Sequence, residues 1–393
     1  MHYNLRYYLL IVGISVLLVV LGHAVILHRT PASPYPELVM AGDSDYYFAM
    51  AEGRAGDVPI PFRYRVLVPF IARLLPLDLP ISFMLITYLS LFVCYILALI
   101  TCRKLGLYPF ASIVGLFALF TTSAHLYNYH NPYLTDALAL AALFAMFAML
   151  VKRSFSGFMA SLVVGVLARE TIIFLSPIWL MTKEWRKGAA AILIAIIAFV
   201  VPRLALSAHN DPSVIQYTAA QIRDIWGTGD LLHFFRYLYS TWHMLWLLMP
   251  IGLILMPWEK WSFPAAAFVI LFIGAALSSV VAFDMLRMFS ILSPVVVVSC
   301  AFLFSSLWAR SRVVAILFIA LLAIKLFIGL PTVATPPDSW ACSGKLPVHI
   351  YYALGMAYSL LVVLLLRGPI MGGVKEKAAR LSLHLSQIKK KEC

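Results

Sequence analysis

Residues Gly42 to Pro76, GDSDYYFAMAEGRAGDVPIPFRYRVLVPFIARLLP, form a dense polar stretch in a very apolar chain. Its charged residues are Asp43, Asp45, Glu52, Arg54, Asp57, Arg63, Arg65 and Arg73. Apolar segments long enough to cross a bilayer flank the stretch, at 8–27 and 81–101. Because charged groups are costly beside lipid, this concentration of charge predicts a functional loop at the membrane surface.

The composition excludes a soluble globular protein. The 393 residues are 63% hydrophobic and 12% charged, with a mean hydropathy of +0.92, whereas soluble domains carry about a quarter charged residues. We expect one all-α polytopic membrane domain, residues 1–366, and a basic amphipathic cytoplasmic tail, residues 367–393. About twelve crossings are expected, at 8–27, 81–101, 107–124, 134–151, 157–168, 171–181, 188–207, 238–257, 263–283, 289–308, 313–330 and 349–366.

The distribution of charge predicts the orientation of the chain. With a cytoplasmic N-terminus, every short loop on that side carries Lys or Arg, as the positive-inside rule requires. The first outer loop, residues 28–80, then holds many of the acids, and the net charge of +13 follows topology, so no nucleic acid is expected as a partner. We expect a bacterial cytoplasmic membrane with the site on its outer side. The alternative is the endoplasmic reticulum, since Lys390 to Cys393 fit a dilysine retrieval signal.

Two further stretches point to the same side. The segments 157–168 and 171–181 are too short as α-helices to cross a bilayer, so they predict a hairpin that carries Arg169 and Glu170 to the outer leaflet. The alternative is an ion pair that only fastens two helices. Pro61 to Pro76 is expected to be an amphipathic interfacial helix with its arginines facing headgroups or a lipid phosphate, and the tail a surface helix attracted to anionic lipid.

Asp43 and Asp45 are the candidate catalytic residues. A carboxylate at a membrane-water boundary can take a proton from a sugar hydroxyl and so create a nucleophile. Two acids at this spacing also resemble an oxygen clamp for a divalent cation. Both readings remain open on the sequence alone.

The order of these features resembles the GT-C superfamily of membrane glycosyltransferases, such as protein O-mannosyltransferases and aminoarabinose transferases. The resemblance spans Met1 to about Lys187 and implies that an acid in the first outer loop, followed four residues later by an aromatic, is the catalytic base. Asp43 and Tyr47 have that spacing, although Ser44 stands where better-known members carry a second acid. The implied reaction transfers a sugar, with inversion, from a polyprenyl phosphate to a lipid-linked glycan, glycolipid or envelope polymer.

A lipid-borne donor would require cationic groups at the site, because guanidinium groups hold a phosphate bidentately and stabilise its developing charge. The candidates for binding the donor phosphate are Arg63, Arg65, Arg169, Arg223 and Arg287. The candidates for binding the rest of the substrate are Tyr46, Tyr47, His130, Asn131, Asp136, Glu170 and Asp284. Asp284 and Arg287 lie one helical turn apart and are expected to pair.

Three alternatives are kept. The aromatic stretch 125–136 is expected to bind a sugar or to form an interfacial belt. The loop 207–236 is expected to close over the donor or to be merely solvated. The alternatives to a glycosyltransferase for the whole chain are an oligosaccharide ligase or polymerase, and a secondary transporter or lipid flippase. Lys325 is the one clear mid-helix charge and no internal repeat is found, so transport is less favoured.

Overall fold

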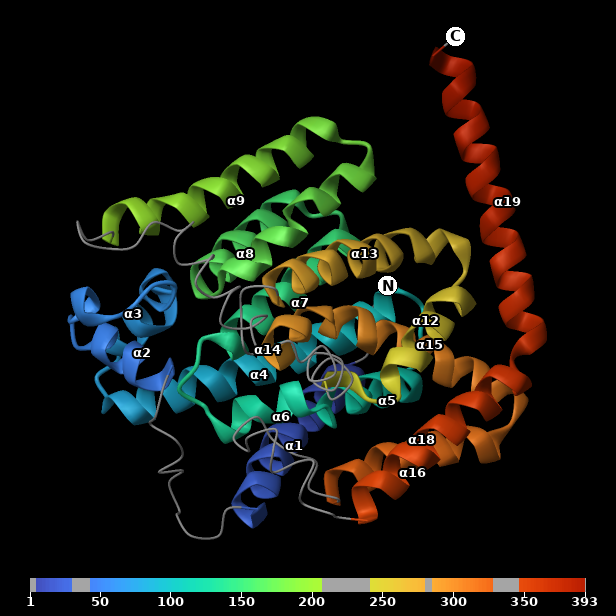
Figure 1. Cartoon of the computed structure of the whole chain (residues 1–393), viewed down its shortest axis with the longest axis horizontal. Coiled ribbons are helices and arrows are strands. Elements are labelled where there is room, and N and C mark those ends of the chain that lie inside the picture. The colour runs from blue at the N-terminus through green and yellow to red at the C-terminus, as the bar shows by residue number, and fades with distance from the viewer. Residues whose placement is uncertain (1–4, 30–42, 207–240, 280–284, 328–345, 393) are drawn as a thin grey trace, which may run out of the picture.

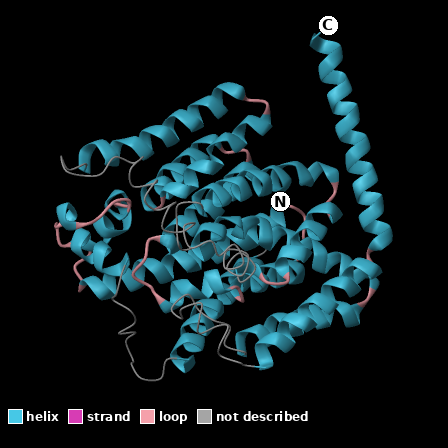
Figure 2. Cartoon of the chain, viewed as in Figure 1, coloured by secondary structure: helices cyan, strands magenta, loops and turns pink. Residues whose placement is uncertain are grey.

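A computed structural model describes residues 5–29, 43–206, 241–279, 285–327 and 346–392. Within these ranges the chain forms α-helices and 3-10 helices (η) and no strand (Figure 2). The first half contains α1 (Leu5–Arg29), α2 (Asp43–Ala51), η1 (Ala55–Asp57), η2 (Phe62–Tyr64), α3 (Leu67–Leu74), α4 (Leu79–Lys104), α5 (Pro109–Phe120), α6 (Ser123–His130), α7 (Asp136–Lys152), α8 (Phe155–Ala168), η3 (Glu170–Thr182) and α9 (Trp185–Leu206). The second half contains α12 (Leu245–Leu255), α13 (Trp258–Ser279), α14 (Met285–Phe289), η4 (Ser290–Leu292), α15 (Ser293–Arg310), α16 (Arg312–Phe327), α18 (Leu346–Leu365) and α19 (Arg367–Glu392).

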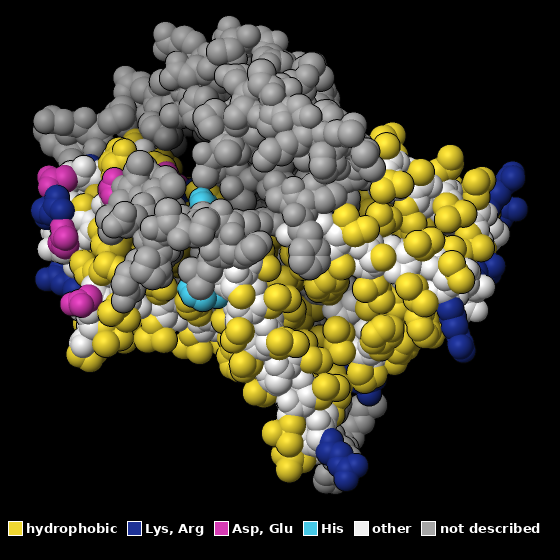
Figure 3. Space-filling view, turned by 90° about the horizontal axis from the view of Figure 1, so that it is seen from below, with side chains coloured by type: hydrophobic (Ala, Val, Ile, Leu, Met, Phe, Trp, Pro, Cys, Tyr) yellow, Lys and Arg dark blue, Asp and Glu magenta, His cyan; other side chains and the backbone are white. Residues whose placement is uncertain are grey.

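Five helices of the described part are long and apolar enough to cross a membrane, or up to seven if each of two bent helix pairs is one span. The span Arg287–Arg310, which ends in α15, is the centre of the bundle, since 89% of it is buried (Figure 1). The span in α9 lies at the edge and is only 17% buried. Apolar side chains cover much of the face in Figure 3. The expectation of an all-α polytopic membrane protein agrees with this arrangement.

Glycines bring the helices around α15 close together. A Cβ atom at Gly115 of α5 would lie 2.4 Å from the carbonyl oxygen of Val297, and one at Gly252 of α12 would lie 2.1 Å from that of Ser299. Small residues permit such close contacts between helices in lipid. The layer α5, α15 and α12 therefore fixes the position of α14 and η4, which directly precede α15.

A second, smaller core is built from the loop after α1. Helices α2, η1, η2 and α3 pack on one another and on α4, at the left edge of the molecule in Figure 1. In α3, Val68 and Ala72 are buried against the protein, whereas Arg73 and the apolar Phe70 and Leu74 are exposed. The same edge carries the mixed acidic and basic side chains seen at the left of Figure 3.

The helix predicted over 61–76 is wrong in its extent, because the structure divides it into η2 and α3. A helix starting at residue 61 would place Pro69 in its interior, where proline breaks a backbone hydrogen bond and clashes with the preceding turn. In α3 the same proline lies in the first turn, where it is tolerated. The break places Arg65 outside the amphipathic helix.

The hairpin predicted around Arg169 is present as two packed arms. Helix α8 ends at Ala168, η3 begins at Glu170, and Arg169 between them has an extended backbone, with φ −157° and ψ 123°. The second arm is a 3-10 helix of 13 residues, whose rise of about 2 Å per residue gives a length of about 26 Å. It is therefore longer than the α-helical arm expected from the sequence.

Candidate active site

Four charged side chains from four distant segments form an ion-pair network. Arg287 of α14 pairs with Asp43 of α2 and with Asp136 of α7, and Asp136 also pairs with Arg169. Arg287 binds one oxygen of Asp136 through both Nε, at 2.9 Å, and Nη2, at 2.7 Å. Asp136 is thus held between two guanidinium groups, which offsets the cost of burying all three charges.

Local structure explains why the acids lie where they do. Asp43 is the first residue of α2 and Asp136 the first residue of α7. The unpaired N–H groups and the dipole of a helix N-terminus favour a carboxylate there. The side chain of Asp43 is 27% exposed, whereas those of Asp136, Arg169 and Arg287 are nearly buried. Asp43 is therefore the outermost member of the network.

A second cluster adjoins the network through the backbone of residues 169 and 170. Arg65 donates through Nε and Nη2 to the two oxygens of Glu170, at 2.9 and 2.7 Å, and through Nη1 to the hydroxyl of Tyr47, at 2.8 Å. Burial opposes both charges, but the attraction between the two groups prevails, so the pKa of Arg65 is raised and the pKa of Glu170 is lowered. Glu170 is therefore a carboxylate at neutral pH.

The amphipathic pattern predicted that Arg65 faces lipid headgroups. In the structure, Glu170 and Tyr47 hold its guanidinium group inside the protein. Arg63 is also buried and donates to the carbonyl oxygens of Val58, at 2.8 Å, Gly56, at 3.1 Å, and Leu206, at 3.2 Å. It fastens the first loop to α9. The phosphate binding predicted for these two arginines stays a prediction beside these contacts.

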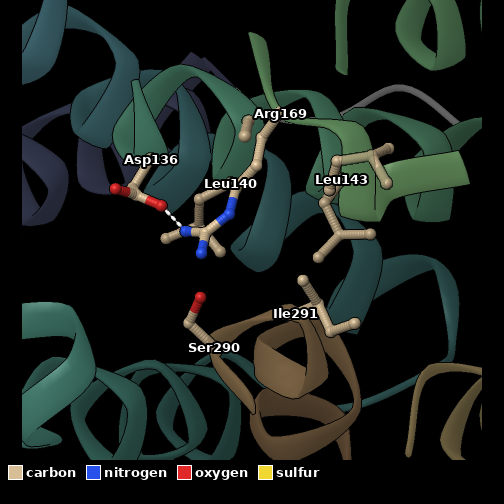
Figure 4. A pocket seen from close by; sticks show the side chains of 8 residues that line it. Asp136, Leu140, Leu143, Arg169, Ser290 and Ile291 are labelled. Carbon is tan, nitrogen blue, oxygen red and sulfur yellow. Dashed lines mark ion pairs between the residues drawn. The ribbon is translucent and has the colours of Figure 1, made fainter. Parts of the chain in front are cut away.

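A small cavity borders the network on the side of η4. Its volume is about 10 Å³ and its lining includes Asp136, Arg169 and Ser290 (Figure 4). The Ser290 hydroxyl lies across the cavity from the Arg169 guanidinium in this view. A space of that size holds about one water molecule, so the cavity itself is too small for a sugar or a phosphate.

Two other predicted residues of the first loop lie apart from the network. Asp45 is exposed, and the ring of Tyr46 packs against Phe62, with 5.1 Å between the ring centroids. Within the described segments no group of three or more His, Cys, Asp or Glu side chains is placed to hold a metal ion. Asp43 pairs with Arg287, and the shared cation of Asp43 and Asp45 stays a prediction.

The aromatic stretch before α7 is built into the protein interior. His125 is buried, with its Nε2 at hydrogen-bond distance from the Tyr95 hydroxyl, which in turn bonds the Tyr129 hydroxyl at 2.7 Å. His130 is also buried, and the side-chain oxygen of Asn131 accepts from the backbone N–H of Tyr133 at 3.3 Å. These contacts stabilise α6 and the turn into α7, which positions Asp136.

Arg223, Asp284 and the loop 207–236 lie outside the described residues, so the predicted Asp284 pair and the lid are not described. The sequence singled out Asp136 as a substrate ligand, and Glu170 as a substrate ligand or a member of an ion pair with Arg169, and it gave no sign of the partners Arg287 and Arg65. Arg203 of α9 was not singled out at all. It stacks on Tyr64 of the first loop, with 4.6 Å from its guanidinium carbon to the ring centroid.

Comparisons with known proteins give no relative: no family model, no curated protein and no solved structure matches the chain. A function can therefore be proposed only from the geometry of the site.

Proposed function

We propose that the chain is a GT-C type glycosyltransferase that moves a sugar from a polyprenyl phosphate to a hydroxyl of a lipid-linked glycan, glycolipid or envelope polymer. One observation carries the proposal: Asp43, the partly exposed acid at the start of α2, is the outer end of a buried Arg-Asp-Arg chain. A base and two phosphate-binding groups thereby lie within one connected network. This is the set of groups that an inverting transfer from a phosphate carrier needs.

Each member has a role in this mechanism. The donor phosphate displaces Asp43 from Arg287, and the freed carboxylate accepts the proton of the acceptor hydroxyl. The acceptor oxygen bonds to the anomeric carbon as the bond from that carbon to the phosphate oxygen breaks, which inverts the configuration. The leaving phosphate gains negative charge, which Arg287 and Arg169 stabilise, while Asp136 holds both guanidinium groups in place.

The proposal includes a particular membrane arrangement. About twelve crossings place the first loop, the start of α7, the 169–170 turn and α14 on the outer side of a bacterial cytoplasmic membrane, with the endoplasmic reticulum as the alternative. The contacts between these four segments support it, since a common site requires them to share one side. An oligosaccharide ligase or polymerase would use the same donor and differ in its acceptor.

A secondary transporter or lipid flippase is the second candidate, and Lys325 of α16 favours it. This lysine is 2% exposed and has no hydrogen-bond partner for its ammonium group in the described structure. In transporters, buried ionisable residues within membrane helices mark the path of a substrate or ion. The candidate active site involves a different set of residues, so the two functions are separable by substitution.

Transfer of radiolabelled sugar to lipid or polymer in isolated membranes tests the proposal, with a panel of polyprenyl-phosphate sugars as donors. Asp43→Asn keeps the size of the side chain but deletes the base, so transfer should fall by about 10²–10⁴-fold. Asp45→Asn is the matched control, two residues away and exposed, and should retain activity at equal protein level. Undiminished transfer in Asp43→Asn, or no transfer from any donor by wild type, would contradict the proposed glycosyltransferase activity.

A further inference from the structure

A large apolar groove lies at the opposite end of η3 and α13 from the ion-pair network. Its volume is about 990 Å³, at the upper end of the range for small-molecule pockets. The end of η3, the end of α12, the start of α13 and one face of α19 line it. The lining residues used below are Lys183, Ile254, Trp258, Trp261 and Arg380.

The position of the groove along the membrane follows from helix lengths. Helix η3 begins beside the network at Glu170 and ends near the groove at Thr182, which separates the two by about 26 Å. Helix α13 begins at the groove with Trp258 and has 22 residues, or about 33 Å. Both lengths approximate the thickness of a bilayer core, so the groove and the network belong to opposite leaflets.

The mouth of the groove has the chemistry of a membrane surface. Trp258 and Trp261 are stacked at its edge, with ring centroids 5.2 Å apart, and tryptophan is enriched at the headgroup level. The charged side chains in the lining, Lys183 and Arg380, are both basic. Under the positive-inside rule this end faces the cytoplasm.

The tail helix is fixed to the wall of the groove. Lys377 donates through Nζ to the carbonyl oxygens of Ile254, at 2.6 Å, and Met256, at 2.9 Å, which end α12. A Cβ atom at Gly373 would lie 2.8 Å from the carbonyl oxygen of Ile254, so the backbones touch here. These contacts place Arg380, one turn further along α19, over the groove.

Arg380 can accept an additional anion. It pairs with Glu259, at 3.6 Å, and Glu376, at 3.1 Å, and all three side chains are 47% exposed or more. Ion pairs with that exposure contribute little, so a phosphate can share or take over the guanidinium group. Lys183, just after η3, offers a second cation in the lining.

We propose that this groove binds an anionic diacyl phospholipid of the cytoplasmic leaflet. The acyl chains lie on the apolar floor between α12 and α13, and the headgroup phosphate lies between Lys183 and Arg380. Basic pockets between membrane helices on the cytoplasmic side bind anionic headgroups in this manner. The site is separate from the proposed glycosyl transfer and does not depend on it.

Tryptophan quenching tests the proposal on the full chain in detergent. Phosphatidylglycerol with brominated acyl chains is compared with phosphatidylcholine carrying the same chains, and Trp258→Phe/Trp261→Phe gives the background from the other tryptophans. The anionic lipid should half-quench the two groove tryptophans at a several-fold lower mole fraction. Lys183→Gln/Arg380→Gln should remove that preference. Arg367→Gln/Lys375→Gln, which loses the same charge from exposed residues outside the groove, should keep it.

The alternatives give different results. Equal quenching by the two headgroups, or an anionic preference that survives in Lys183→Gln/Arg380→Gln, would overturn the proposal. Displacement of the brominated lipid by inorganic phosphate alone would also overturn it, because the site would then recognise a free anion and not a lipid. If the groove is covered by a second copy of the chain, neither lipid quenches the groove tryptophans, and the proposal is wrong.

Discussion

Two buried arginines, Arg63 and Arg65, lie two residues apart and have different partners. Arg63 donates to three backbone carbonyl oxygens, so it ties segments of the chain together. Arg65 binds the carboxylate of Glu170 and so balances a charge. Their sequence context predicted one role, phosphate binding, for both, because side-chain spacing gives no information on partners that lie more than 100 residues away.

Removing the charge of Glu170 should destabilise the protein strongly. In Glu170→Gln the guanidinium group of Arg65 stays buried without its counter-charge, which costs about 3–5 kcal/mol. The control is Glu184→Gln, since that carboxylate is at the far end of η3 and pairs with Lys187 while 46% exposed. Its loss should change the thermal midpoint in detergent very little. Equal shifts in the two variants would contradict the role of the Arg65 pair.

The same pair predicts the pH dependence of that difference. The folded-state pKa of Glu170 is below its ordinary value, so its contribution is complete above the unfolded value of about 4.3 and is lost as pH falls through the folded pKa. Arg65 has a raised pKa, so its contribution is complete below its unfolded value and decreases only at strongly alkaline pH. Midpoints of wild type and Glu170→Gln should therefore differ by a constant amount between about pH 5 and 9. A difference between the two midpoints that changed with pH in this range would show that it comes from groups other than Glu170 and Arg65.

At the scale of helices, the apolar runs predicted most elements well. The segments expected at 81–101, 134–151 and 188–207 correspond to α4, α7 and α9, because a run of apolar residues with charged ends has few other structures available in lipid. The prediction was poorer where the backbone, and not apolar periodicity, determines the type and the ends of a helix. The interior proline separated α3 from η2, and η3 took the 3-10 form, which apolar periodicity does not distinguish.

The contact of α12 with α15 gives a prediction for a single methyl group. Gly252→Ala would place its Cβ atom against the Ser299 carbonyl, which the backbone must move to accommodate, at a cost of about 1–3 kcal/mol. Gly13→Ala is the control, because nothing lies within 4 Å of a Cβ atom there and alanine favours the helix. Thermal midpoints in detergent should fall for Gly252→Ala and stay level or rise for Gly13→Ala. The reverse order would show that α12 and α15 are not packed as described.

At the scale of the whole molecule, the site depends on contacts that local spacing does not reveal. The pair of Arg287 with Asp284 stays a prediction, since Asp284 lies outside the described residues, but spacing gave no sign that Arg287 also pairs with acids 151 and 244 residues away. The sequence did predict that Asp43, Asp136, Arg169 and Arg287 belong to one side of the membrane. It could not predict their order in the network, since helix packing around α15 sets that order.

In the proposed mechanism, the pairing of Arg287 with Asp43 makes the Asp43 carboxylate a built-in competitor of the donor phosphate. A ligand phosphate must displace a tethered carboxylate, so the measured affinity understates the intrinsic affinity of the guanidinium group. Asp43→Asn should therefore bind a short-chain isoprenyl phosphate about tenfold more tightly, which corresponds to one charge-assisted hydrogen bond. Titration calorimetry would show the gain, and unchanged or weaker binding would contradict it. The substitution that lowers the proposed transfer would then be the one that binds the lipid phosphate most tightly.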